Sequence, residues 1–118
     1  MLRAALSLLA AVLLAGCASL PPAQPITSIE TIQGRWQGQI RFGFGSYQML
    51  YLTVNPDATV LMEWGVNTRW GRVLIGGGRA RFEIYIWSGN LGYFAGPEGR
   101  ILTMQSDFAA FDAQLTPR

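Results

Sequence analysis

The sequence predicts an all-β domain: a small antiparallel meander of about seven or eight short strands that closes into a barrel or folds into a sandwich. From Gly34 onward, polar and apolar residues alternate with a period of two, which is typical of strands with one solvated and one buried face. Turn signals recur about every 8 to 12 residues. The connections between them are too short for the crossover helices that a parallel sheet requires.

The first two strands are expected at 34–42 and 47–54. In the first, Trp36 shares a face with Ile40, whereas the second is apolar on both faces and is therefore expected to be covered on both sides. The tetrapeptide Asn55-Pro56-Asp57-Ala58 between this strand and the next is a turn, because proline fixes φ and the Asn and Asp side chains bond locally.

The middle of the chain predicts strands at 59–64 and 70–75 with a connection at 65–68. The triplet Gly76-Gly77-Gly78 turns the chain into the clearest alternating segment, 79–87. One face of that segment is expected to carry Ala80, Phe82, Ile84 and Ile86, and the other Arg81, Glu83, Tyr85 and Trp87.

The last third predicts short strands at 91–95 and 100–106, with turns at 88–90 and 96–99. The final segment, 107–116, is compatible with a closing strand or with a short helix capped by Ser106 or Asp107. A strand is favoured, since the apolar residues alternate there: Ala109, Phe111, Ala113 and Leu115.

A barrel of about eight strands has an interior that side chains fill or that holds one small ligand. Trp36, Phe82 and Phe111 are large enough to fill much of such an interior. Strands of roughly six to nine residues are mostly shorter than the 9 to 11 residues that span a membrane as a barrel.

Composition argues against several functions. The chain has 118 residues, no histidine, and nine arginines as its only basic residues, for a net charge of +2 that falls to +1 when Arg3 leaves with a leader. That charge is too small to predict nucleic-acid binding. Without histidine the usual general base is missing, so no enzyme is expected. The single cysteine allows no internal disulfide and no metal cluster.

The one catalytic possibility considered is glycoside hydrolysis by a pair of carboxylates, which two of the five acidic residues in the strand region could form. Nothing in their spacing selects a pair, and they are expected to pair with arginines on solvated faces. They are Glu63, Glu83, Glu98, Asp107 and Asp112.

The N-terminus has the pattern of a signal peptide. A positive start at Arg3 precedes eleven mainly apolar residues, 4–14, too few for a transmembrane helix of roughly 20 residues. This run ends in Leu14-Ala15-Gly16-Cys17, which resembles the lipobox of bacterial lipoproteins. An ordinary signal peptide cut elsewhere and a buried helix are the alternatives.

The resemblance implies a signal peptide over 1–16 that is cleaved between Gly16 and Cys17. It also implies a diacylglycerol on the Cys17 thiol and an N-acyl chain on the new amino group, with no other cofactor. Alanine, and not aspartate, at position 18 implies the outer membrane, with the domain facing the periplasm. The resemblance therefore also implies that the protein is bound to a membrane through its lipid anchor.

Residues 17–33 are expected to be the lipidated cysteine and a flexible tether that precedes the β domain, 34–118. Three prolines, Pro21, Pro22 and Pro25, exclude a regular helix or central strand in this segment. Fully extended, residues 18–33 would reach about 50 Å. One helical turn is expected at Thr27-Ser28-Ile29-Glu30.

The tripeptide Gly34-Arg35-Trp36 at the first strand resembles the Gly-x-Trp signature of lipocalins and related calycin barrels. In that family the tryptophan plugs the closed end of the barrel. The resemblance implies a second possible function, a carrier of a small apolar ligand. It identifies no ligand-contacting residue in this chain.

A set of aromatic residues near strand ends, accompanied by arginines such as Arg69, Arg72 and Arg81, has the composition of a binding patch. A small β core and its rim use the same residue types. The candidate patch consists of Trp64, Trp70, Trp87, Tyr85, Tyr93 and Arg81. The function predicted first is a lipid-anchored, non-catalytic docking module whose partner is another envelope component.

Overall fold

The computed structural model describes residues 20–118. The predicted signal peptide 1–16, its cleavage site at Gly16, the lipidation site Cys17 and residue Ala18 lie outside the described residues. The described part contains these elements in chain order: β1 (Ala23–Gln24), η1 (Ile29–Thr31), β2 (Gly34–Phe42), β3 (Tyr47–Val54), β4 (Thr59–Trp64), β5 (Asn67–Gly76), β6 (Arg79–Ile84), β7 (Trp87–Gly96), β8 (Gly99–Ser106), η2 (Asp107–Ala109) and β9 (Phe111–Pro117).

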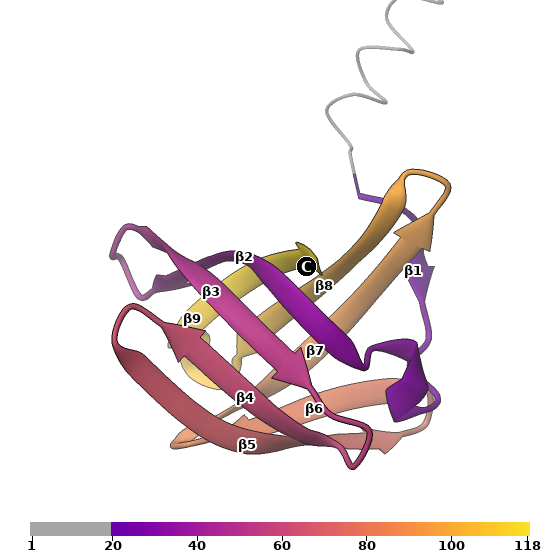
Figure 1. The fold of residues 1–118 in the computed structure, drawn as a ribbon, viewed down its shortest axis with the longest axis horizontal. Helices are drawn as coiled ribbons and strands as arrows, with labels where there is room; N and C mark the ends of the chain where they lie inside the picture. Colours follow the sequence, from indigo (N-terminus) through magenta and orange to yellow (C-terminus); the bar gives the residue numbers. More distant parts are fainter. Residues whose placement is uncertain (1–19) are drawn as a thin grey trace, which may run out of the picture.

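The eight strands β2 to β9 form a closed antiparallel barrel (Figure 1). Each strand pairs with the next one in the chain, and β9 returns to pair with β2, where Gln39 lies opposite Gln114. This confirms the predicted all-β meander and shows that it closes as a barrel. Closure removes most of the exposed strand edges, but β6 pairs with β7 only as far as Leu91 and leaves the end of β7 open on that side. The short strand β1 is an addition to the barrel, since it pairs with β7 at Phe94 and Tyr93.

Large apolar side chains occupy the barrel interior. Trp36, Phe82 and Phe111 are each no more than 2% exposed, and the rings of Phe82 and Phe111 stack with their centroids 5.6 Å apart. The Trp36 indole N–H donates a hydrogen bond of 2.8 Å to the carbonyl oxygen of Ile32. The interior is therefore a packed core of the kind that an eight-stranded barrel can hold.

Two glycines in mid-strand positions allow neighbouring strands to approach closely. A Cβ on Gly38 of β2 would collide with the carbonyl oxygen of Gln114 on β9. A Cβ on Gly89 of β7 would lie 2.6 Å from the Phe82 ring. Glycine at such points allows the sheet to bend sharply enough to close.

The strand predicted over 79–87 is present as β6, with Ala80, Phe82 and Ile84 buried as expected, but it ends at Ile84 and its predicted extension to 87 is wrong. The chain turns at Tyr85 and Ile86, and β7 then runs through both the predicted turn at 88–90 and the predicted strand at 91–95. Tyr85 adopts a φ of 57° without being glycine or asparagine, so this turn has no sequence signal. As a result Ile86 is exposed, whereas Trp87 packs against the core.

The expectation that 47–54 is covered on both faces is also wrong. Leu50, Leu52 and Val54 are buried, but Tyr47 and Met49 are exposed, because the barrel wall is a single sheet with solvent outside. The connection predicted at 65–68 is shorter, since β5 begins at Asn67. The closing strand favoured for 107–116 is present only from Phe111, as β9, whereas Asp107–Ala109 form the 3-10 turn η2.

The described part of the predicted tether packs on the barrel from Pro22 onward. The Pro22 carbonyl accepts a hydrogen bond of 3.1 Å from the Ala95 amide, and the Ile26 amide donates one of 2.9 Å to the Gly78 carbonyl. Ile26 and Ile32 are buried. We call residues 22–33 the strap. Proline excludes regular helix but permits extended chain along a sheet edge, and the spaced isoleucines supply the packing. The helical turn expected at 27–30 is present as η1.

Candidate docking site at the aromatic end of the barrel

Alternate connections of a meander lie at the same end of the barrel. The loops at 43–46, 65–66, 85–86 and 107–110 share one end, on the left of Figure 1, which we call the aromatic end. The turns at 55–58, 77–78 and 97–98 share the opposite end, where the strap also contacts the barrel. We call it the strap end.

Four aromatic rings from four different strands meet inside the aromatic end. The centroid of Phe42 on β2 lies 5.3 Å from that of Trp64 on β4 and 5.6 Å from that of Trp87 on β7. Trp87 in turn lies 5.4 Å from Phe111 on β9, edge to face. Such pairs contribute about 0.5 to 1.5 kcal/mol each beyond the area they bury. They form a rigid aromatic base beneath the loops.

Arg69 is the charged residue of this cluster. It lies opposite the buried Met62 in the β4–β5 pairing and so belongs to the inner face of the sheet. Its guanidinium carbon lies 4.6 Å from the centroid of the Tyr85 ring and 5.9 Å from that of Trp64. Cation–π contacts of this kind orient the guanidinium.

The hydrogen-bonding capacity of Arg69 is only partly used. Its Nη1 donates to the Thr68 carbonyl oxygen at 2.9 Å, but its Nε is buried and has no hydrogen-bond partner among the described residues. None of the three ion pairs within residues 20–118 includes Arg69. A buried donor without a partner is uncommon in folded proteins and costs stability.

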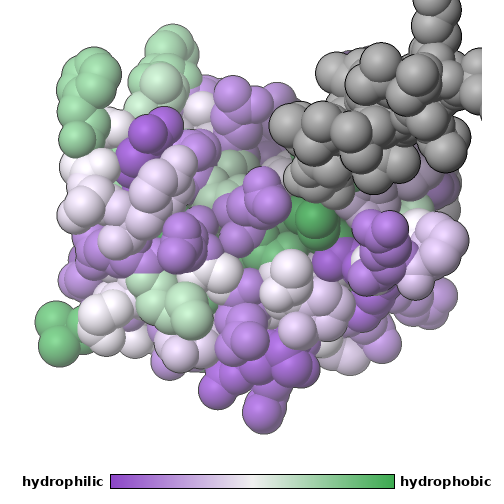
Figure 2. All heavy atoms as spheres, turned by 90° about the horizontal axis from the view of Figure 1, so that it is seen from above, coloured by the Kyte–Doolittle hydropathy of each residue, from purple (hydrophilic) through white to green (hydrophobic). Residues whose placement is uncertain are grey.

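Each loop of the aromatic end exposes a large apolar side chain at its tip. Phe44, Val66 and Phe108 are fully exposed, and Ile86 is 77% exposed with Tyr85 beside it at 62%. In Figure 2 hydrophobic side chains project at the left edge of the molecule, the side of the aromatic end in Figure 1. We call Phe44, Val66, Ile86 and Phe108 the tips. The strap-end turns have different residues: Asn55, Pro56, Asp57, Ala58, Gly77, Gly78, Pro97 and Glu98.

Two loops of the aromatic end hold bulky residues in the left-handed region of backbone space. Phe108 has a φ of 60° and Tyr85 a φ of 57°. This region costs an ordinary residue roughly 1 to 2 kcal/mol and is taken most readily by glycine and asparagine. Both residues are also exposed, so they add little burial in exchange for the strain. Backbone strain of this kind concentrates at functional positions.

A groove opens between two of these loops. It lies between the 43–46 and 107–110 loops, and its lining includes Arg41, Phe44, Gln105, Phe108 and Asp112. The Arg41 and Asp112 side chains form an ion pair of 3.5 Å at its side. The aromatic end therefore combines projecting side chains with a recess that can receive a side chain from a partner.

The structure separates the six residues of the predicted patch. Trp64, Trp87 and Tyr85 lie together at the aromatic end. Tyr93 packs edge to face against Trp36 deeper in the barrel, at 6.5 Å, and Trp70 is exposed on the outer face of β5.

Arg81, the sixth predicted residue, is hydrogen-bonded to Asn90 and paired with Asp107. The prediction did not include the tips. In the sequence, the tips could have been found as large apolar residues at the centre of predicted loops, as in Gly43-Phe44-Gly45.

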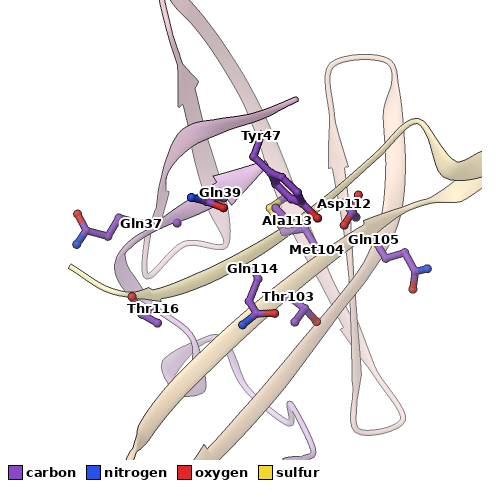
Figure 3. A pocket seen from close by; sticks show the side chains of 11 residues that line it. Gln37, Gln39, Tyr47, Thr103, Met104, Gln105, Asp112, Ala113, Gln114 and Thr116 are labelled. Atoms are coloured by element: carbon purple, nitrogen blue, oxygen red, sulfur yellow. The ribbon is translucent and has the colours of Figure 1, made fainter. Parts of the chain in front are cut away.

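A second groove crosses the outer wall of the barrel over β3, β2, β9 and β8 (Figure 3). Its lining is mostly amide and hydroxyl side chains: Gln37, Gln39, Thr103, Gln105, Gln114 and Thr116, with Tyr47 at one side. In the β8–β9 pairing Thr103 lies opposite Gln114. This groove is open to solvent and lies outside the packed core, so it is not an internal ligand chamber.

Of the acidic residues considered for catalysis, three form ion pairs with arginines: Glu83 with Arg72, Asp107 with Arg81, and Asp112 with Arg41. Among residues 20–118 no group of three or more His, Cys, Asp or Glu side chains is arranged to hold a metal ion. Within the same range, no helix has the length and apolar character needed to cross a membrane.

These features define a class of architecture, a small closed antiparallel β-barrel with an N-terminal strap and an apolar loop end. Comparison of the chain with protein-family models, with curated proteins and with solved structures finds no match.

Proposed function

We propose that this protein is a lipid-anchored envelope protein whose barrel is a non-catalytic docking module, with the aromatic end as its contact surface. One observation carries the proposal. Every loop at this end of the described barrel exposes a large apolar residue, whereas the turns at the strap end do not. Exposed aromatic residues beside an arginine are the composition of interface hot spots.

The anchor is Cys17, at the end of Leu14-Ala15-Gly16-Cys17. With a diacylglycerol on its thiol and an acyl chain on its amino group, it would hold the protein stably, since single chains bind membranes only marginally. The protein then faces the periplasm from the outer membrane.

A carrier of a small apolar ligand is the second candidate, supported by the calycin-like Gly34-Arg35-Trp36. Trp36 is buried, and the Arg100 guanidinium carbon lies 5.1 Å from its ring centroid, an arrangement that suits a plug at one end of a barrel. The packed interior favours the docking module, because Phe82 and Phe111 occupy the space that a ligand would need. A hydrolase is a remote third candidate, since arginines engage three of the carboxylates.

Site-specific photo-crosslinking tests the docking surface. We would introduce p-benzoylphenylalanine at Phe44 or Phe108 of the full chain in its native membranes, with Glu98 at the strap end as the matched exposed control. We expect adducts with one and the same partner from positions 44 and 108 and none with it from position 98. Equal adducts from both ends, or none from the tips, would contradict docking through the aromatic end.

Metabolic labelling with palmitate tests the anchor. We expect label on the wild-type protein, and expect Cys17→Ala to lose the label and leave the membrane fraction. The barrel should remain folded in this variant, because strands β2 to β9 close it and side chains from residues 20–118 fill its interior. Wild-type protein without label would refute the lipid anchor.

A further inference from the structure

Resting on the proposed function, we propose that the aromatic end faces away from the membrane that holds Cys17, and that it binds a protein partner presenting a carboxylate to Arg69. The occupant is an apolar protein segment with an acidic side chain. Two independent observations carry this: the length of chain between the anchor and the barrel, and the unused donors of Arg69.

The link between the anchor and the barrel is short. Pro22 is held to β7 by the hydrogen bond from Ala95, and five residue steps separate it from Cys17. At about 3.3 to 3.6 Å per residue, Cys17 lies at most about 18 Å from Pro22.

The tips lie farther from Pro22 than this link can reach. From Ala95 to Trp87, β7 covers eight residue steps toward the aromatic end, or about 26 Å along the strand. With strands tilted by about 40° to the barrel axis, the corresponding height is about 20 Å. The turn at Tyr85 and Ile86 adds to it. While the strap is in place, a membrane surface that touches all four tips at once therefore lies beyond the reach of Cys17. The tips face the aqueous side, which favours a protein over a bilayer as their occupant.

Arg69 defines the chemistry of the contact. Its Nε is buried without a partner, and no carboxylate of the described chain pairs with it. A guanidinium with free donors suits a carboxylate, which it binds through two parallel hydrogen bonds. Because Nε is buried, a carboxylate reaches it only if the side chains around it shift when the partner arrives, and the Tyr85 ring is one of those that contact the guanidinium.

The surroundings of Arg69 strengthen such a contact. The tips lie on the four loops at the same end of the barrel as Arg69, and Trp64 packs against its guanidinium. When a partner covers this end, water is excluded from the contact, where a charged pair is worth more than in solvent.

The test uses the full lipidated chain in native membranes with p-benzoylphenylalanine at Phe108. It compares Arg69→Gln and Arg69→Lys with Arg72→Gln as the control, since Arg72 is an exposed arginine on the same strand, paired with Glu83. We expect the protein adduct to fall at least about tenfold with Arg69→Gln, less with Arg69→Lys, and not at all with Arg72→Gln. Thermal melting of each variant shows whether it is folded.

A second arm tests the bilayer as the occupant. Purified lipidated protein with the same crosslinker is placed in vesicles of phosphatidylethanolamine and phosphatidylglycerol at a ratio of about 3:1, with no other protein. We expect no lipid adduct at position 108, and lipid adducts there would overturn the inference. A protein adduct in native membranes that Arg69→Gln leaves unchanged would also overturn it, while the proposed docking would stand. If the chain with wild-type Arg69 gave no protein adduct from position 44 or 108 in native membranes, the proposed function itself would be refuted.

Discussion

Phe108 is the residue where local stability and the proposed contact conflict most clearly. It is fully exposed and has a φ of 60°. Asparagine tolerates this conformation better than phenylalanine does. A protein selected for stability alone has no reason to keep an aromatic residue there, so we interpret Phe108 as a residue retained for contact.

Phe108→Asn should therefore separate stability from docking. We expect the free energy of unfolding to rise by up to about 1 kcal/mol, while crosslinking from position 44 falls. The control is Ala58→Asn at the strap end, where Ala58 has a φ of 70°. Because Ala58 is partly buried against the core, this substitution should stabilise the fold less, and it should leave crosslinking unchanged. Urea unfolding measures the first quantity, and a loss of stability in Phe108→Asn together with unchanged crosslinking would contradict the interpretation.

Trp36 connects the barrel to the strap. Its buried indole N–H donates to the Ile32 carbonyl at 2.8 Å, so Trp36→Phe removes this hydrogen bond and part of the packing. We expect a loss of about 1 to 3 kcal/mol in the free energy of unfolding and faster amide hydrogen exchange in the strap. Trp70→Phe, on the outer face, should change stability by less than about 0.5 kcal/mol. Equal effects of the two substitutions would show that the strap is not held through Trp36.

At the scale of elements, the sequence predicted those strands well that are bounded by glycine, proline or asparagine. The turn at 55–58 follows from such residues, and the Thr59 hydroxyl and amide both donate to the Asp57 carboxylate, which lowers the pKa of that group. The turn at Tyr85 and Ile86 could not be predicted in this way, because neither residue type favours a turn. The strap could not be predicted from its prolines, because its docking depends on a surface that exists only after the barrel closes.

The candidate site was predicted only in part, for a related reason. Trp64, Tyr85 and Trp87 were identified because aromatic residues gather near strand ends, but Trp70 and Tyr93 share that signal and lie elsewhere. The tips are far apart in sequence and become neighbours only through the strand pairing. Because alternate connections of a meander lie at the same end, a large apolar residue in every second loop of the sequence would have predicted this surface.

Barrel closure requires β2 and β9 to approach closely at Gly38, and this requirement can be tested. A Cβ at Gly38 would collide with the Gln114 carbonyl oxygen, whereas one at Gly76 has nothing within 4 Å. We expect Gly38→Ala to reduce the free energy of unfolding by about 1 to 3 kcal/mol or more, and Gly76→Ala to change it little. A Gly38→Ala protein as stable as wild type in urea would show that the seam is not closely packed.

At the scale of the whole molecule, the two barrel ends have different roles. The strap end connects the barrel to the proposed anchor through the strap and carries short turns without exposed large apolar side chains. The aromatic end carries the tips, bulky residues in left-handed backbone at Tyr85 and Phe108, and the incompletely hydrogen-bonded Arg69. An anchor at one end and an apolar contact surface at the other suit a module that is held at a membrane and reaches toward a partner.

The most direct test of this account replaces three tips together and leaves the fourth as the reporter. With p-benzoylphenylalanine at Ile86, the wild-type chain in native membranes is compared with the triple variant Phe44→Ser, Val66→Ser and Phe108→Asn. Because these side chains are fully exposed, the melting temperature and the membrane-bound fraction should not fall. We expect the partner adduct to fall at least about tenfold. A triple variant that stays folded and anchored and still gives the adduct at the wild-type level would contradict the claim that the tips are the contact surface.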